Sequence, residues 1–241
     1  MNWNCIVFGL RAAALVLALV GAGAVPTAAQ RSRPGLREVR DLGTAGVNLV
    51  VAVPTGEFKR NVDVAGGVDL FGALNVGRPL SLRFEGSYLV YGSENRFVAQ
   101  PYYPLSINTT YSIMTLGIGP QITLGEAPVR LYGFGTVGAS YLSASSSYRF
   151  GGCACDVVGT GTDFDDWTTA LQAGGGLLVS LRSRRAPIAL DLGARYLTNG
   201  YAWYVTPGDV VSQPTGLVNV YPTRTRADLV MIHFGVLVSI R

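Results

Sequence analysis

The sequence has little charge and, beyond its first residues, no long apolar run. Only 14% of its 241 residues are charged, whereas a soluble domain averages about 25%. The sequence has 19 lysine and arginine residues against 15 aspartate and glutamate residues. A positive excess this small, spread along the chain, argues against nucleic-acid binding. Past residue 29, no apolar stretch approaches the roughly 18 residues that indicate a membrane-spanning helix. The 49% of residues that are hydrophobic must therefore lie in another pattern.

Cysteine and histidine are also scarce, which limits the metal and catalytic sites that the chain can form. Cys153 and Cys155 are the two cysteines beyond residue 29, and two thiols are too few for a structural zinc site. In an oxidising compartment they would usually form a disulfide, although so small a ring would be strained; two free thiols or a link between chains remain open. The single histidine, His233, lies in no grouping that identifies a serine nucleophile for a Ser-His-Asp site. We therefore expect no catalytic residue, no metal site and no cofactor.

A cluster of acidic residues is the alternative cation site. Asp163, Asp165 and Asp166 lie close together in the sequence, as the oxygen ligands of a calcium ion can. EF-hand spacing is absent, however. We interpret the three residues as solvated acids of a loop.

The one uninterrupted apolar segment lies at the N-terminus. Residues 12–25 follow Arg11 and precede small residues up to Ala29, and these 14 residues are too few to cross a bilayer as a helix, which needs about 20. A basic residue, a short apolar core and small residues at a cleavage site are typical of a secretory signal peptide. We expect residues 1–29 to be this signal peptide, with an uncleaved anchor as the alternative. Residues 30–43 then form an Arg-rich periplasmic lead-in.

From Thr44 onward, apolar and polar residues alternate with a period of two, which predicts β-strands. Within residues 81–91 the even positions are apolar or small, whereas Arg83 and Glu85 occupy the other face. The segment 129–142 is ambiguous, because two aromatic residues share a face with polar ones. We predict eight strands, over residues 45–53, 64–74, 81–91, 110–124, 129–142, 167–182, 188–197 and 226–240.

The predicted connections alternate between long and short. Those after the second, fourth and sixth strands have 4 to 6 residues, and the other four have 10 to 28. Tight turns at one end and long loops at the other are typical of a transmembrane β-barrel, which tilted strands of about 9–11 residues can form. The sequence therefore predicts an all-β fold over residues 44–241: an eight-stranded, antiparallel, up-and-down transmembrane β-barrel with short periplasmic turns and long extracellular loops.

Aromatic residues gather near the predicted loop ends and in the loops. Those on the strands suit an aromatic girdle at a membrane interface, and we assign to it Tyr88, Tyr91, Tyr111, Tyr141, Trp167 and Tyr196. Aromatic residues in the loops either anchor an extracellular ligand or protein or fold over the rim of the barrel. These are Phe97, Tyr102, Tyr103, Tyr201, Trp203, Tyr204 and Tyr221.

The order of these parts resembles a known family. An apolar leader precedes a first strand that runs into VAVPTGEF at residues 51–58, then a Gly-rich second strand, then LRFEGSY at residues 82–88. In these features the chain is similar to the small outer-membrane β-barrels of the OmpA transmembrane-domain, OmpX and OmpW type. The resemblance implies an eight-stranded barrel in an outer membrane. Members of that family usually close on an aromatic residue, whereas this sequence ends with Ile240 and Arg241.

Charged residues on the inward faces predict a network inside the barrel. An eight-stranded barrel has an interior just wide enough to be filled by side chains, and an unpaired buried charge costs several kcal/mol. We expect the turn at residues 75–80 to bring Asp69 beside Glu85, with Arg83 bridging the two. The predicted cluster is a structural plug, with a binding or gating site as the alternative, and comprises Asp69, Arg83, Glu85, Asp191 and Arg195, joined by Asn48, Gln121, Gln172 and His233.

Three functions follow from this interpretation. The first is a non-enzymatic outer-membrane barrel with a structural or surface-interaction role, whose partners are the membrane lipid and an extracellular ligand or protein. The second is a soluble, lipocalin-like binding barrel of the periplasm, in which apolar residues would line the inside. The third is a lipid-modifying barrel enzyme, for which the sequence offers no catalytic grouping.

Overall fold

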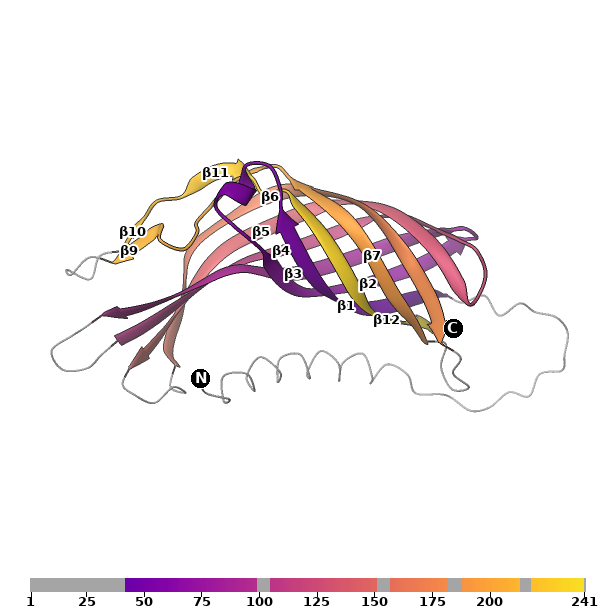
Figure 1. The fold of residues 1–241 in the computed structure, drawn as a ribbon, viewed down its shortest axis with the longest axis horizontal. Coiled ribbons are helices and arrows are strands. Elements are labelled where there is room, and N and C mark those ends of the chain that lie inside the picture. The colour runs from indigo at the N-terminus through magenta and orange to yellow at the C-terminus, as the bar shows by residue number, and fades with distance from the viewer. Residues whose placement is uncertain (1–41, 99–104, 151–156, 182–187, 213–217, 241) are drawn as a thin grey trace, which may run out of the picture. The chain divides into compact units, whose positions relative to one another are not determined.

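The structure is a computed structural model that describes residues 42–98, 105–150, 157–181, 188–212 and 218–240 (Figure 1). These residues belong to a compact unit that begins at Arg40. The predicted signal peptide, the pair Cys153 and Cys155, and the loop residues Tyr102 and Tyr103 lie outside the described residues.

The eight predicted strands form a closed antiparallel barrel. Around the barrel the order is β1, β12, β7, β6, β5, β4, β3 and β2, and β1 pairs with both β12 and β2. The predicted fold class is thus confirmed; most strands are longer than expected, whereas the last begins at Leu229 rather than at residue 226. The bounds are β1 (Gly43–Pro54), β2 (Ala65–Gly77), β3 (Leu80–Val98), β4 (Leu105–Leu124), β5 (Val129–Phe150), β6 (Val157–Leu181), β7 (Ile188–Asn199) and β12 (Leu229–Ile240).

The register of the strands defines the tilt of the barrel. A path of directly paired residues leaves β6 at Trp167, passes once around the barrel and returns to β6 at Leu177, ten positions further on. With about 3.3 Å per residue and about 4.8 Å between strands, this stagger corresponds to a tilt of roughly 40°. The residues on the path between these two are Tyr141, Met114, Tyr88, Val68, Leu49, Phe234 and Leu192.

Successive side chains alternate between the outside and the lumen, as the period-two pattern predicts. Along β12, Ile232 and Phe234 are exposed, whereas Met231 and His233 are buried. The faces assigned to β3 and β7 follow the same rule. On β5, whose faces the sequence left ambiguous, the polar face and its aromatic residues point inward.

One close approach in β2 requires glycine. A Cβ atom on Gly67 would lie 1.9 Å from the carbonyl oxygen of Tyr88 on β3, which no side chain tolerates. At the adjacent Gly66, the nearest atom would be 3.9 Å away. The Gly-rich character of this strand therefore reflects tight packing at one position rather than along its whole length.

The predicted second and third long loops are instead largely β-structure. Strands β3 and β4 continue to Val98 and from Leu105, and β5 and β6 continue to Phe150 and from Val157. In Figure 1 these four strands extend beyond the rest of the barrel. The strand ends predicted on either side of residues 92–109 and 143–166 were therefore wrong. Ser, Thr and Asn on both faces of these segments interrupt the alternation of apolar and polar residues without preventing backbone pairing.

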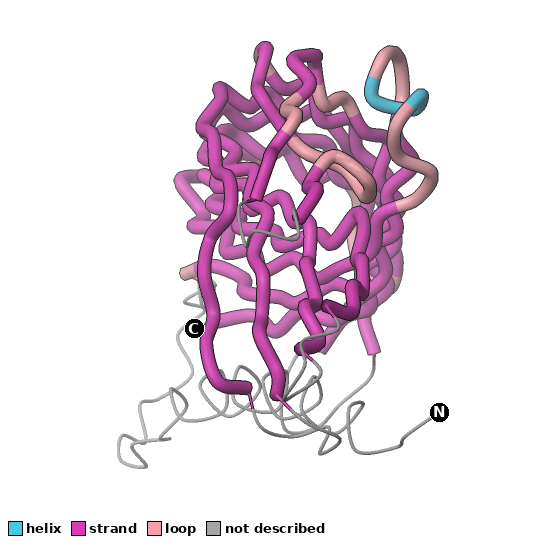
Figure 2. Tube along the Cα trace, turned by 90° about the vertical axis from the view of Figure 1, so that its left-hand side faces the viewer, coloured by secondary structure: helices cyan, strands magenta, loops and turns pink. Residues whose placement is uncertain are grey.

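The first and last long connections also contain regular structure. The short 3-10 helix η1 (Phe58–Arg60) lies between β1 and β2. After β7, the chain forms β8 (Tyr201–Tyr204), which pairs with β11 (Thr223–Arg226), and β9 (Val210–Ser212), which pairs with β10 (Val218–Val220). Figure 2 shows these loops and the cyan helix at one end of the barrel. Within the described ranges, no helix has the length and apolar character to cross a membrane.

The interior is filled in three layers. Toward the short turns lies an apolar cluster that includes Phe71, Tyr132 and Leu237. Charged and polar side chains fill the middle. Toward the long connections lies a larger apolar cluster, called here the lid, which combines barrel residues with loop residues such as Phe58 and Tyr204.

Candidate functional site: the lumen network

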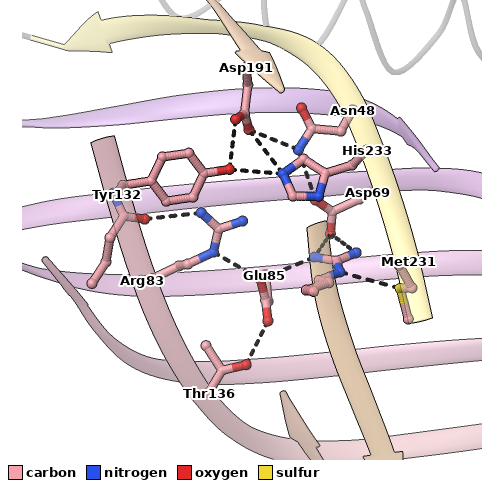
Figure 3. Close-up of polar contacts among 11 residues, drawn as sticks. Asn48, Asp69, Arg83, Glu85, Tyr132, Thr136, Asp191, Met231 and His233 are labelled. Carbon is pink, nitrogen blue, oxygen red and sulfur yellow. Dashed lines mark hydrogen bonds and ion pairs between the residues drawn. The ribbon is translucent and has the colours of Figure 1, made fainter. Parts of the chain in front are cut away.

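Arg83 lies at the centre of one half of the polar layer (Figure 3). Its Nε donates to Glu85 Oε2 at 2.8 Å, and Nη1 donates to Gln121 Oε1 at 3.0 Å. Its guanidinium carbon also lies 4.3 Å and 4.2 Å from the ring centroids of Phe71 and Phe134. The cation is thus held between two aromatic faces, an arrangement that stabilises a buried guanidinium.

Arg195 is the cation that connects the two carboxylates. Its Nη2 lies 3.0 Å from Asp69 Oδ1, and its Nη1 lies 3.3 Å from Glu85 Oε2. The sequence correctly placed Asp69 near Glu85, but the prediction that Arg83 bridges them was wrong. Arg195 reaches across the lumen from β7, a contact between strands that local spacing does not reveal, while Arg83 is engaged by its aromatic neighbours.

Asp191 organises the other half of the polar layer. Its Oδ1 accepts a hydrogen bond from the hydroxyl of Tyr132 at 2.7 Å, and its Oδ2 accepts one from Asn48 Nδ2 at 3.2 Å. His233 Nε2 lies 2.8 Å from the same tyrosine hydroxyl and 3.7 Å from Asp191 Oδ2. Asn48 Nδ2 also lies 3.1 Å from Asp69 Oδ2, which connects the two halves.

The network compensates for the burial of its charges. Three carboxylates face two guanidinium groups, and all five side chains are buried. The surplus negative charge is met by neutral donors, because Tyr132 and Asn48 donate to Asp191, and Thr136 donates to Glu85 Oε1 at 2.6 Å. A buried ion that keeps several partners avoids most of its desolvation cost. The arrangement suits a rigid plug.

The network lacks the parts of a hydrolytic or metal site. His233 Nε2 faces a tyrosine hydroxyl and a carboxylate rather than a serine. Across the described ranges, no group of three or more metal-ligating side chains is present. The acidic cluster of β6 does not converge, because Asp163 bonds to Ser146 and Asp166 Oδ2 accepts from the backbone N of Trp203 at 2.8 Å.

The lid closes the lumen above the network. Tyr204 is 1% exposed, its ring contacts that of Phe58 edge-on with centroids 5.0 Å apart, and its hydroxyl accepts from Asn61 Nδ2 at 2.8 Å. The hydroxyl of Tyr91 donates to the carbonyl oxygen of Val205 at 3.0 Å. The last connection therefore crosses the barrel mouth from β7 to β3. The sequence left open whether loop aromatics fold over the rim, and Tyr204 does.

Four of the six side chains assigned to the aromatic girdle lie on the outer surface of the barrel. Tyr88, Trp167 and Tyr196 are exposed on the outer surface, and Tyr141 packs against Trp167 with ring centroids 4.8 Å apart. Assignment of two further tyrosines to the girdle was wrong. They share the inward register of Arg83 on β3 and of Thr115 on β4, so their rings belong to the lid; these are Tyr91 and Tyr111.

The outer surface of the barrel is apolar on every strand. Its large exposed hydrophobic residues form a belt around the barrel, and the charged residues at this level point inward. The belt includes Leu49, Val51, Val68, Leu70, Phe84, Tyr88, Met114, Leu116, Ile118, Leu131, Val137, Leu171, Leu177, Leu192, Tyr196, Ile232 and Phe234.

Comparisons with known proteins return structures but no sequence relatives. No family model and no curated protein matches the chain. The neisserial surface protein A structure is 14% identical, with a TM-score of 0.43, and the match covers 82% of this chain and 97% of that one. Ail of Yersinia pestis, in complex with the heparin analogue sucrose octasulfate, is 13% identical over 82% and 99%, with a TM-score of 0.40. A major outer membrane protein from Thermus thermophilus is 11% identical over 81% and 99%, with a TM-score of 0.39.

Proposed function

We propose that the chain is a non-enzymatic β-barrel of an outer membrane, exported with residues 1–29 removed as a signal peptide. The observation that carries this proposal is the apolar belt, which surrounds the barrel while the charges lie inside. Soluble monomers rarely expose a contiguous apolar patch beyond a few hundred Å². A barrel that is apolar outside and polar inside matches the environment of a bilayer.

The same distribution of side chains argues against a soluble binding barrel. A lipocalin-like protein needs an apolar cavity and a polar exterior, whereas here the ionic residues occupy the middle of the lumen and the exterior is apolar. Leu192 and Phe234 are 51% and 52% exposed, and leaving such a side chain in water forgoes about 1.5–3 kcal/mol of burial. The closed strand order also leaves no unpaired barrel edge, as lipid requires.

The role we assign to the barrel is structural or surface-interacting. The lumen network and the lid fill the interior, which favours a closed barrel over a conducting pore. Strands β3 to β6 extend beyond the rim and expose Phe97, and the last connection exposes Tyr221. We propose that these surfaces meet an extracellular ligand or protein, and that the belt meets the membrane lipid.

Refolding tests the proposed location. The denatured chain is diluted either into plain buffer or into a detergent solution, and folding is followed by gel mobility with and without heating. We expect aggregation in buffer, and in detergent a compact form whose mobility changes on heating. A chain that is monodisperse and folded in plain buffer would contradict the outer-membrane proposal and favour a soluble barrel.

A further inference from the structure

The outer face of the two-stranded sheet formed by β8 and β11 combines two arginines with two aromatic rings. Tyr201 and Trp203 are 60% and 44% exposed, and the strand register places Arg226 opposite Tyr201 and Arg224 opposite Trp203. Each guanidinium lies over the ring of its partner, with distances from Cζ to the ring centroid of 5.2 Å and 5.8 Å. These four residues are called the rim patch.

The two arginines of the rim patch are not engaged by a carboxylate at close range. Within the described part of the chain, neither arginine forms an ion pair. The two nearby carboxylates have other partners: Asp166 accepts from the backbone N of Trp203 at 2.8 Å, and Asp228 accepts from the hydroxyl of Thr198 at 2.9 Å. Each guanidinium group lies over an aromatic ring, and both arginines are exposed to solvent.

The rim patch lies at the edge of the apolar belt. Tyr196 is the outward aromatic residue near the end of β7, and its hydroxyl donates to Asp228 Oδ2 at 3.3 Å. Arg226 stands two residues before Asp228, about 7 Å along the chain at about 3.3 Å per residue. The headgroup layer of a bilayer is of similar depth, about 5–7 Å on each side of the hydrocarbon. Because the chain length sets an upper limit on this separation, a membrane whose hydrocarbon core covers the apolar belt would bring its phosphate layer close to the two arginines.

We propose that the rim patch binds the phosphate group of an anionic lipid in the membrane around the barrel; this inference rests on the proposed function. A guanidinium offers paired N–H donors that match phosphate oxygens, and tyrosine and tryptophan prefer the membrane interface. Arg224 and Arg226 are alternate residues on one strand face, about 7 Å apart. Both can therefore contact one headgroup or two neighbouring ones.

The test is lipid binding by the full chain folded in a neutral detergent. Phosphatidic acid or phosphatidylcholine is titrated, and native mass spectrometry counts the bound lipids. We expect the wild type to prefer phosphatidic acid, and the double variant R224Q/R226Q to bind it about 30-fold more weakly. That factor corresponds to about 1 kcal/mol for each arginine, at 1.4 kcal/mol per tenfold. The variant R224K/R226K should lie between the two, because lysine keeps the charge and loses the planar fork.

The control variant K59Q/R60Q removes the same charge from the exposed helix η1 at the same end of the barrel. It should bind phosphatidic acid as the wild type does. Equal affinity for both lipids, or an equal loss in the control, would overturn the inference. Displacement of the lipid by inorganic phosphate at the same concentration would assign the site to free phosphate and would also overturn it.

Failure of the two proposals can be told apart. Every variant is first checked for the change of gel mobility on heating. A wild type that folds in detergent but shows no preference for phosphatidic acid contradicts the rim patch alone. A wild type that remains folded and soluble in plain buffer contradicts the outer-membrane location, and the lipid site with it.

Discussion

At the scale of single residues, the lumen network depends on pairs rather than on individual charges. Arg195 contacts Asp69 and Glu85 at once, so removing it leaves Asp69 without a cation and Glu85 with Arg83 alone in a closed interior. Replacing a whole buried ion pair by apolar side chains is often nearly neutral, whereas removing one partner costs about 3–5 kcal/mol. We therefore expect the network to contribute more to the specificity of packing than to net stability.

We predict that Arg195→Leu lowers the free energy of unfolding by about 3–5 kcal/mol. The exposed Arg60 on η1 serves as the control, since a surface change such as Arg60→Leu usually stays within about 0.5 kcal/mol. Unfolding by denaturant in detergent measures both. The double variant Asp69→Leu/Arg195→Leu should lose less than Arg195→Leu alone, and a larger loss would contradict the pairing.

Much of this network could be predicted from the sequence, but its partners could not. Alternation alone placed Arg83 and Glu85 on the inward face, and both are buried. Which cation bridges the carboxylates depends on the register across the lumen, which sequence spacing does not encode. The aromatic partners of Arg83 were also missed, because Phe134 shares its face with polar residues and an inward aromatic face looks ambiguous in a single strand.

At the scale of elements, hydrophobic alternation located all eight barrel strands but not their full length. β5 was expected to end at Leu142, yet it continues to Phe150. Beyond Leu142 half of the side chains are serine and do not indicate a buried face, but their hydroxyls form hydrogen bonds across strands, as Ser146 does with Thr109 at 2.7 Å. The backbone pairing of β5 therefore continues beyond the segment in which apolar and polar residues alternate.

The last connection is an element in its own right, because it supplies part of the lid. We predict that Tyr204→Ala loosens this connection while the barrel stays folded, since truncating a buried aromatic residue costs about 3–5 kcal/mol. Trypsin should then cleave after Arg224 or Arg226 about 100-fold faster than in the wild type, which corresponds to about 3 kcal/mol of local opening. Gel mobility without heating should not change.

The matched control for the lid is Tyr221→Ala in the same connection. Tyr221 is 61% exposed, so its truncation should leave the cleavage rate within about twofold of the wild type, as for other surface changes. If the two variants are cleaved at the same rate, Tyr204 does not hold the lid. Unfolding of the whole barrel by Tyr204→Ala would show that lid and barrel form one cooperative unit.

At the scale of the whole molecule, the barrel has apolar side chains on its outer surface and charged side chains in its interior, the reverse of a soluble protein. A substitution of one outward-facing residue tests this distribution. Leu192 is 51% exposed in the middle of the apolar belt, where an arginine facing lipid costs about 2–4 kcal/mol. We predict that Leu192→Arg reduces the fraction of chain that folds into lipid vesicles, measured by heat-modifiable mobility. Thr160→Arg, on the exposed extension of β6 beyond the belt, should fold as the wild type does. A soluble barrel predicts the opposite for the first variant, because an arginine on a water-facing surface would improve solubility and leave folding unchanged.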